Sequence, residues 1–217
     1  MNTTRAPLRE RKKAKIREAL IATSFRLFSE QGYTETTLEQ ICDQCDVTVQ
    51  TLLRYFGSKD DLLFGSHAGI LQRFTSGLSQ AAVKKSALEY WLRFLRQNLA
   101  QLQSDKTIRQ TYRIIIGSPS LLVRFRSITR QYESAVEQAL SEEVGLKPGQ
   151  DLYSTLMAHL IVSGPIEQAL RCIEHGEIDL MVERCERAVQ FILENFKRPA
   201  VDDDTRSAKL PPKRKTR

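Results

Sequence analysis

Apolar residues recur at intervals of three and four positions along nearly the whole chain, from about residue 9 to residue 197. This spacing places them on one face of an α-helix, whereas the strict alternation typical of a β-strand is nearly absent. Glycine and proline, 10 and 7 in 217 residues, are sparse inside the periodic segments. The sequence therefore predicts an all-α protein.

The first predicted helix runs from about Arg9 to Gln31 and stops at Gly32. A second is expected to open at residues 36–39, where Thr36 and Glu39 form a capping box. In such a box the hydroxyl and the carboxylate bond free backbone donors at the helix start. The two helices are thus expected to be separated by only a few residues.

Thr48 is expected to cap a short third helix that ends near Phe56, since Gly57 follows. Ser58 is then expected to cap a long fourth helix. About five further helices are predicted near residues 86–102, 105–117, 119–143, 150–175 and 177–197. Gly164-Pro165 lies in the middle of one of them and predicts a kink, with backbone carbonyls left free near it.

The net charge of +7 is concentrated at the two ends of the chain. Residues 1–17 carry seven Lys/Arg and one Glu, and residues 197–217 carry eight Lys/Arg and three Asp. The rest of the chain is mildly acidic. This distribution favours a polyanionic partner, although basic tails that only aid solubility would look the same. We expect residues 1–14 to be a flexible basic arm and residues 198–217 a disordered basic tail.

No apolar stretch is long enough to span a bilayer, which predicts no membrane partner. Arg17, Glu18 and Arg26 interrupt the first candidate segment, so the amino terminus does not resemble a signal peptide. A cytoplasmic protein is expected.

Cys42 and Cys45 form a Cys-x-x-Cys pair, which is compatible with redox chemistry or with half of a zinc site. No second pair at metal spacing follows, although Cys172-x-x-His175 comes close. All four cysteines, Cys185 included, fall on the apolar stripes of predicted helices, where cysteine behaves as a small hydrophobic residue. We therefore expect packing residues, with no metal site and no cofactor.

Catalytic constellations are not evident in the sequence. The histidines lie on separate segments, at positions 67, 159 and 175. No arrangement typical of a nucleophile with its general base accompanies them. An enzyme is the disfavoured class.

Two short helices joined by a tight turn, the second capped by a threonine, are typical of a helix-turn-helix. The first helix of such a unit crosses the DNA backbone and the second enters the major groove. The residues expected to lock the two helices together are Ile41, Cys42, Cys45, Val47 and Leu52. Those left pointing outward are Val49, Gln50, Leu53 and Arg54, with Thr51, Tyr55 and Lys59 beside them.

This region resembles the DNA-binding domain of the TetR family of transcriptional regulators. The resemblance is carried by Phe28-x3-Gly32-Tyr33-x2-Thr36-Thr37-Leu38-x2-Ile41 and then Val47-Thr48-x2-Thr51-Leu52-x-Arg54-Tyr55-Phe56-x2-Lys59-x2-Leu62-Leu63. It implies a three-helix DNA-binding domain over residues 15–65, followed by a helical effector-binding and dimerisation domain over residues 66–197. It also implies that Thr51, Tyr55 and Lys59 hold phosphates, and that Val49, Gln50, Leu53 and Arg54 face bases. The expected DNA contacts further include Thr37 and Thr48.

The residue chemistry agrees with these roles. Gln50 can pair with adenine and Arg54 with guanine, and an apolar side chain such as Val49 can lie against a thymine methyl group. Lys59, expected in the first turn of the fourth helix, would add its charge to backbone donors that face a phosphate. The alternative is that Gln50 and Arg54 are ordinary solvated residues.

Three departures from the family pattern make the preferred DNA sequence hard to infer. Leu53 replaces the usual aromatic residue, and Asp46 replaces the usual glycine, although aspartate tolerates a left-handed turn better than most residues. Cys42 and Cys45 replace alanines.

A basic arm precedes the first helix. Its cationic residues are Arg5, Arg9, Arg11, Lys12, Lys13 and Lys15. We hypothesise that this arm follows the minor groove, whose negative potential attracts arginine.

The last predicted helix carries a stripe of coiled-coil spacing: Ile178, Val182, Cys185, Val189, Ile192 and Phe196. The helix before it carries a comparable stripe: Leu152, Leu156, His159 or Leu160, and Ser163. The two stripes resemble the helices through which the family forms dimers. Packing inside one chain would need the same spacing.

Family analogy further implies an apolar cavity for a small-molecule effector. The residues expected to contact the effector are Trp91, Phe94, Tyr112, Arg113, Phe125 and His159. An anionic head group would find cations among Arg109, Arg113, Arg124 and Arg126. Plain core packing and a solvated arginine face are the alternatives.

The function that these features favour is a ligand-responsive repressor. It would act as a homodimer on a pseudo-palindromic, double-stranded DNA operator. An activator or a ligand-independent regulator of the same fold is the alternative.

Overall fold

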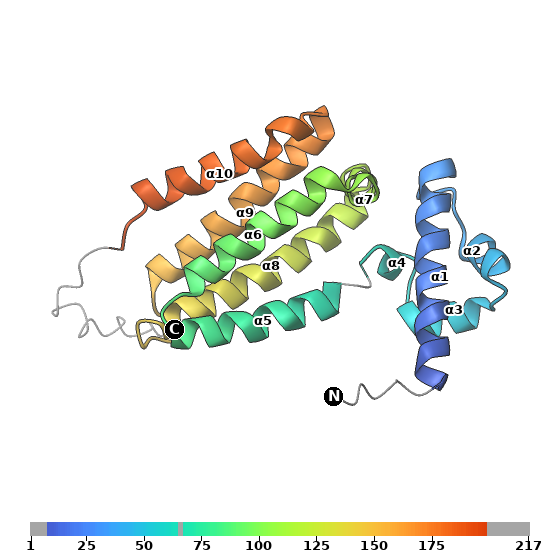
Figure 1. Ribbon diagram of the computed structural model, residues 1–217, viewed down its shortest axis with the longest axis horizontal. Helices are drawn as coiled ribbons and strands as arrows, with labels where there is room; N and C mark the ends of the chain where they lie inside the picture. Colours follow the sequence, from blue (N-terminus) through green and yellow to red (C-terminus); the bar gives the residue numbers. More distant parts are fainter. Residues whose placement is uncertain (1–7, 65–66, 199–217) are drawn as a thin grey trace, which may run out of the picture.

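The computed structural model describes residues 8–64 and 67–198, which contain α-helices and no strand (Figure 1). The helices are α1 (Leu8–Gln31), α2 (Leu38–Cys45), α3 (Val49–Phe56), α4 (Asp60–Phe64), α5 (His67–Val83), α6 (Ala87–Ser104), α7 (Lys106–Ile116), α8 (Pro119–Glu142), α9 (Leu152–His175) and α10 (Ile178–Asn195). The predicted all-α class is confirmed. None of these helices is long and apolar enough to cross a membrane.

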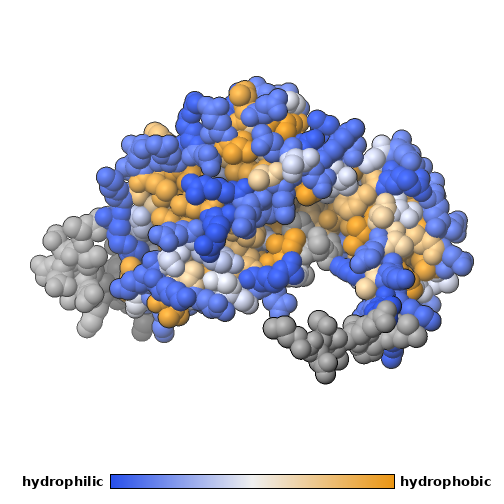
Figure 2. Space-filling view, viewed as in Figure 1, coloured by the Kyte–Doolittle hydropathy of each residue, from blue (hydrophilic) through white to orange (hydrophobic). Residues whose placement is uncertain are grey.

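Helices α1–α4 form a small amino-terminal domain, and α5–α10 form a larger body (Figure 1). Long helices lie side by side in the body, with α8 packed against both α5 and α9. The short helix α7 lies at the end of the body that faces the small domain, where it contacts α1. Hydrophilic residues cover most of the visible face of both parts (Figure 2).

Two clusters of buried residues hold these parts together. The first fills the body around Trp91, which is 2% exposed. The second fills the small domain around Leu20 and Leu52, and it continues into the body through Leu121 and Phe125. Burying a large apolar side chain contributes about 1.5–3 kcal/mol. The small domain is therefore joined to the body by apolar packing rather than by a linker alone.

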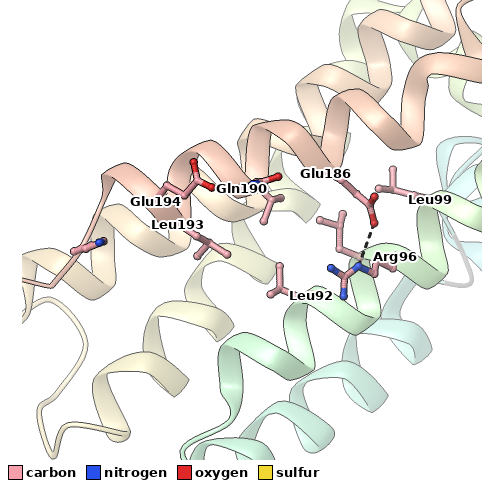
Figure 3. A pocket seen from close by; sticks show the side chains of 10 residues that line it. Leu92, Arg96, Leu99, Glu186, Gln190, Leu193 and Glu194 are labelled. Atoms are coloured by element: carbon pink, nitrogen blue, oxygen red, sulfur yellow. Dashed lines mark hydrogen bonds and ion pairs between the residues drawn. The ribbon is translucent and has the colours of Figure 1, made fainter.

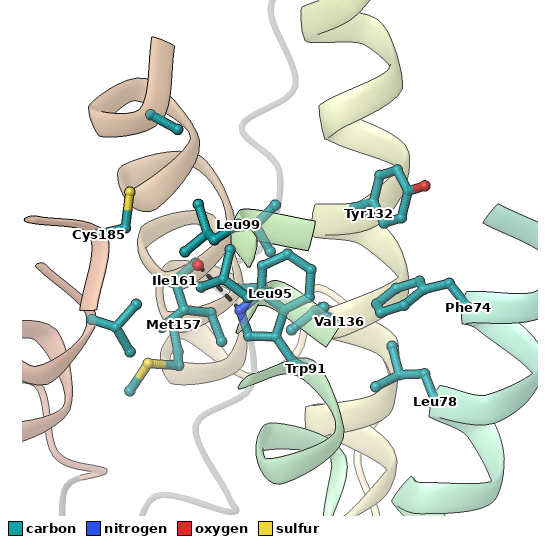
Figure 4. Packing of buried hydrophobic residues seen from close by; sticks show 14 of the residues in the cluster. Phe74, Leu78, Trp91, Leu95, Leu99, Tyr132, Val136, Met157, Ile161 and Cys185 are labelled. Carbon is teal, nitrogen blue, oxygen red and sulfur yellow. Dashed lines mark hydrogen bonds between the residues drawn. The ribbon is translucent and has the colours of Figure 1, made fainter. Parts of the chain in front are cut away.

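Pro165 lies inside α9, which continues past it to His175. Because proline has no backbone N–H, the carbonyl of Ile161, four residues earlier, loses its helical partner. The indole Nε1 of Trp91 on α6 donates to this carbonyl at 3.1 Å (Figure 4). The sequence predicted a free carbonyl here, and tertiary packing supplies its donor.

Helix α10 packs mainly on α9 and only partly on α6. A groove of about 510 Å³ separates α10 from α6, with Leu92, Leu99 and Leu193 in its walls (Figure 3). Arg96 bridges it by donating to Glu186 at 3.2 Å. Both partners of this ion pair are exposed, so it adds little stability. Helices α9 and α10 thus behave as one packed unit.

The stripe predicted as a dimer seam on the last helix packs inside the chain instead. Cys185 and Val189 are buried in the core of the body. The other members, Ile178, Val182, Ile192 and Phe196, are half-buried against the same core. Helices α9 and α6 supply the partner surface within one chain, and spacing alone does not distinguish this from a second chain.

The predicted capping box of the second helix is one residue out of register. The cap is Thr37, whose hydroxyl accepts from the Gln40 amide at 3.2 Å, while the Gln40 side chain accepts from the Thr37 amide at 2.9 Å. Thr36 is buried and donates to the Gly32 carbonyl at 2.7 Å. Its hydroxyl closes the preceding loop and is not available as a cap.

Two further expectations are corrected. The long fourth helix is instead the short α4, followed by α5 after residues 65–66, which lie outside the described ranges. The flexible arm over residues 1–14 is helical from Leu8 onward. Residues 1–7 and the predicted tail from residue 199 onward lie outside the described residues.

The four cysteines are free, and Cys42, Cys172 and Cys185 are buried. Cys45 is half-buried, with its thiol 3.3 Å from the Thr23 hydroxyl. Burial raises the pKa of Cys42 above its usual value and that of Cys185 to about 12. Both thiols are therefore protonated at neutral pH, as expected for packing residues.

We predict that Trp91→Phe lowers the free energy of unfolding by about 1–3 kcal/mol beyond the loss of ring volume, because the Ile161 carbonyl becomes buried without a partner. The same substitution in a Pro165→Ala background should cost less, because the alanine amide can donate to that carbonyl. Urea denaturation of the four proteins at one protein concentration measures both penalties. Equal penalties in the two backgrounds would contradict the assignment.

Candidate nucleic-acid interface and effector cavity

The angle between α2 and α3 is fixed by three residues. Asp46 ends α2 in the left-handed conformation, with φ 51° and ψ 47°. The Val47 amide then donates to the Cys42 carbonyl at 3.1 Å. Thr48 caps α3 by accepting from the Thr51 amide at 3.1 Å. The predicted tight turn is present, and Asp46 adopts the left-handed backbone conformation that glycine adopts most readily.

Buried side chains lock the two helices together beneath this turn. Ile41 and Leu52 are fully buried, and Cys42 is 2% exposed. Val47 and Cys45 pack against the same cluster while half-buried. The five residues predicted to form the locking core therefore meet in space.

The outer face of α3 presents Gln50, Leu53 and Arg54 to solvent. Val49, Thr51 and Tyr55 are half-buried, so each keeps only part of its surface available. Within the described ranges, the side chains of Gln50 and Arg54 enter no hydrogen bond or ion pair. Their hydrogen-bonding groups are therefore free to contact the edge of a DNA base.

Lys59 precedes α4 by one residue rather than lying in its first turn. Its ammonium group sits 4.3 Å from the centre of the Tyr33 ring and 3.4 Å from the Thr34 carbonyl. The Tyr33 hydroxyl in turn donates to Asp60. Burial lowers the pKa of Lys59 from its usual value, with the carboxylate of Asp60 acting in the opposite direction. The cation is held in place beside the loop that contains Tyr33 and Thr34.

The first turns of α1 lie beside α3 and form a basic groove of about 880 Å³. Its cations are Arg9, Lys12 and Lys13 from α1 and Arg54 from α3, and Tyr55 lines it too. The residues expected in a mobile arm are thus partly helical and adjacent to the outward face of α3. Glu10 lines the groove as well, and the four cations leave a net positive charge that suits a phosphate backbone.

A second candidate site is a cavity of about 380 Å³ in the body, next to the small domain. Four predicted effector residues, Trp91, Phe94, Tyr112 and Phe125, line it together. Sequence reasoning missed several other wall residues: Phe25, Leu63, Ile70, Ile128, Ile166, Ala169 and Leu170. Helical periodicity can show that an apolar residue packs inward, but it cannot show that residues of several helices surround one space.

The remaining predicted effector residues lie elsewhere. Arg113 is exposed, and His159 lies on the surface with its Nδ1 3.0 Å from Glu133. Three of the proposed anion-binding arginines, Arg109, Arg124 and Arg126, are engaged by carbonyls or carboxylates of the protein. Arg109 donates to the Leu102 carbonyl at 3.2 Å, and Arg126 lies 3.5 Å from Glu167.

Arg124 joins the body to the small domain. It is on α8, and its guanidinium pairs with Asp61 and lies 3.7 Å from Asp60 on α4. It also stands 5.4 Å from the centre of the Phe64 ring. The neighbouring residue on α8, Phe125, lines the cavity. Adjacent residues of α8 thus take part in the cavity wall, through Phe125, and in the ion pair with α4, through Arg124.

The sequence profile described as “Bacterial regulatory proteins, tetR family” matches residues 20–65, which include α2, α3 and α4. Residues 20–65 are therefore a TetR-family DNA-binding domain. This match agrees with the prediction from the sequence that the protein is a transcriptional regulator. DNA binding is the activity that the matched domain supplies.

A curated relative extends the likeness beyond that domain. The HTH-type transcriptional regulator TcmR of Streptomyces glaucescens is 24% identical over 151 residues, which cover 66% of this chain and 67% of TcmR.

Solved structures share the fold of this chain over nearly their whole length. SmeT of Stenotrophomonas maltophilia, in a complex with triclosan, has a TM-score of 0.64 at 18% identity, covering 91% of this chain and 99% of SmeT. FadR of Thermus thermophilus, in complex with lauroyl-CoA, has a TM-score of 0.59 at 19% identity, covering 86% of this chain and 99% of FadR.

We predict that Arg54→Ala weakens binding to a DNA duplex selected from a random library by about 1–3 kcal/mol, because the variant cannot form a bidentate pair of hydrogen bonds with a guanine. Discrimination at one base pair should relax at the same time. Arg130→Ala, which removes the same charge from the exposed surface of α8, is the matched control. An Arg54→Ala protein with unchanged affinity and base preference would refute the role of Arg54.

The basic groove gives a separate prediction. Replacing Arg9, Lys12 and Lys13 with Gln should reduce the slope of log affinity against log salt by about 0.9 for each phosphate that the variant no longer neutralises. The base preference should stay the same, because phosphate contacts carry no sequence information. The control replaces three exposed body lysines, Lys84, Lys106 and Lys147, with Gln. Equal salt slopes for the two triple variants would rule out a role for the groove.

Proposed function

We propose that this TetR-family protein is a ligand-responsive repressor of the cytoplasm that binds a pseudo-palindromic operator as a homodimer. The observation that carries the proposal is the position of the cavity. Its wall combines residues of the body with Phe25 of α1 and Leu63 of α4. A ligand in this space touches both the body and the DNA-binding domain.

The proposed DNA contacts are those of α3 and its surroundings. Gln50, Leu53 and Arg54 would read base edges, with Val49 beside them. The phosphate contacts would come from Thr37, Thr48, Thr51, Tyr55 and Lys59, and from the basic groove. The exposure of the first three and the fixed position of Lys59 support this division.

The proposed dimer face is the outer surface of α9 and α10. Leu152 is 72% exposed and Phe191 is 66% exposed. Leu156, Leu160 and Leu180 add further exposed apolar surface on the same two helices. Clustered exposed apolar residues mark an interaction surface. In a symmetric dimer the two copies of α3 would enter successive major grooves, roughly 34–36 Å apart.

The proposed coupling runs from the cavity through α8 to α4. A ligand that displaces Phe125 also moves the adjacent Arg124, which pairs with Asp61. Helix α4 carries Asp60, which accepts from Tyr33, and the Tyr33 ring holds Lys59. The ligand shifts DNA binding only by the difference in its affinity for the two conformations. The bound states of SmeT and FadR support ligand binding in a body of this fold.

A double substitution tests the dimer and the operator together. Leu156→Glu with Phe191→Glu should convert the dimer to a monomer in sedimentation, because two charges would be buried at the contact. Operator affinity should fall by more than about a hundredfold, since one half-site supplies only part of the contacts. Ser127→Glu with Arg130→Glu, which places two glutamates at exposed positions of α8 away from α9 and α10, is the control. A monomeric wild-type protein, or a double variant that still binds as a dimer, would refute the proposal.

Repression itself is tested by footprinting the selected operator in its promoter. A site that overlaps the region occupied by RNA polymerase, with reduced transcription in vitro, is the expected result. Increased transcription from that promoter would instead identify an activator.

A further inference from the structure

The wall of the cavity holds very little charge. Among the residues that line it, Asp105 is the one carboxylate, and lysine, arginine and histidine are absent from this wall. Asp105 lies at the exposed rim, where it accepts from the amides of Thr107 at 2.7 Å and Ile108 at 3.2 Å at the start of α7. A carboxylate or phosphate deep in the cavity would lack a counter-charge, which costs several kcal/mol. The wall therefore disfavours an anionic ligand.

Aromatic rings supply much of the wall. Trp91 and Phe94 lie with their ring centres 5.9 Å apart, and Phe94 stacks on Tyr132 at 5.9 Å. Tyr112 and Phe125 meet edge to face, with centres 5.5 Å apart. These spacings are those of favourable aromatic pairs, and a further ring can extend the same arrangement. A volume of about 380 Å³ suits a small molecule.

Two phenol hydroxyl groups lie in this wall, in addition to the hydroxyl groups of Thr107, Thr111 and Thr129. Tyr112 and Tyr132 both line the cavity, and neither hydroxyl has a hydrogen-bond partner in the part of the chain that the structure describes. Burial raises the pKa of Tyr112 and raises that of Tyr132 to about 12, so both are neutral and can donate. Among the described residues, Ser141 Oγ is the one side-chain polar atom that is fully enclosed without a partner, so the two phenol oxygens keep accessible surface. Each is therefore available to hydrogen-bond a ligand oxygen.

We infer that the effector is an uncharged aromatic compound with a hydroxyl or carbonyl oxygen that hydrogen-bonds Tyr112. This inference rests on the proposed function, because it names the ligand class of the proposed effector cavity. The wall offers no cation to a fatty-acid or acyl-phosphate head group, the rings favour an aromatic body, and the two phenols favour a polar oxygen. Tyr132, on α8, is the second partner.

The test uses three compounds of matched shape: biphenyl, 4-phenylphenol and biphenyl-4-carboxylate. At neutral pH the first two are uncharged and the third is an anion. Calorimetry on the full chain measures their dissociation constants. Trp91 is the sole tryptophan of the sequence and lies in the wall, so its emission reports whether binding occurs in this cavity.

We expect 4-phenylphenol to bind at least about tenfold more tightly than the carboxylate. Tyr112→Phe should weaken 4-phenylphenol by about three- to thirtyfold and leave biphenyl unchanged, because the substitution removes only the hydrogen bond. Tyr90→Phe is the matched control, since Tyr90 is on α6 but does not line the cavity. Unchanged thermal unfolding of both variants shows that they are folded.

The inference is overturned if the carboxylate binds as tightly as the phenol, if Tyr112→Phe has no effect on the phenol, or if none of the compounds changes Trp91 emission. Failure of the proposed function gives a different pattern. In that case 4-phenylphenol binds with the expected dependence on Tyr112, but a saturating concentration leaves operator affinity unchanged. Laurate serves as a further, non-aromatic anion in the operator-release assay. If laurate releases the operator and the three aromatic compounds do not, the proposed function stands and the proposed ligand class is refuted.

Discussion

The hydrogen bond from the Trp91 indole to the Ile161 carbonyl is the contact on which the body of this protein depends. Pro165 removes the helical partner of that carbonyl, and a buried carbonyl without a donor would destabilise α9. Supplying the donor from α6 fixes the distance and rotation between the two helices. It also fixes the Trp91 ring, against which Phe74 packs edge to face with ring centres 5.8 Å apart. The missing hydrogen-bond donor at Pro165 thus sets the position of Trp91, which lines the proposed effector cavity.

The second constraint is the way α4 is held between the two domains. Its apolar residues, Leu62, Leu63 and Phe64, are buried, while Asp60 and Asp61 meet Arg124 of the body. The arginine and its partners are about one-third exposed, so the ion pairs define geometry more than they add stability. A helix of five residues cannot be stable alone. Its position therefore follows from its neighbours, which makes it responsive to changes in the cavity wall.

The recognition unit, in contrast, is built from local interactions. Asp46 in the left-handed conformation, the Thr48 cap and the buried Leu52 act within a dozen residues of one another. Because these features are local, the helix-turn-helix could be predicted from the sequence, including the departure at Asp46. The capping box of α2 was displaced by one residue because the Thr36 hydroxyl closes a loop against the end of α1. That contact depends on the path of the loop and leaves no local signal.

The sequence by itself determined the all-α class, most helix boundaries and the outward face of α3, since these follow from helical periodicity and capping. The tertiary structure decided which apolar helix faces pack against one another. The Cys185 stripe is buried within the chain, while Leu152 and Phe191 remain exposed. It also decided that Arg124 pairs with α4 and that Phe25 and Leu63 join the cavity wall. The physical reason is that helical periodicity shows which face of a helix is apolar. It does not show which residues cover that face, because those residues lie far away in the sequence.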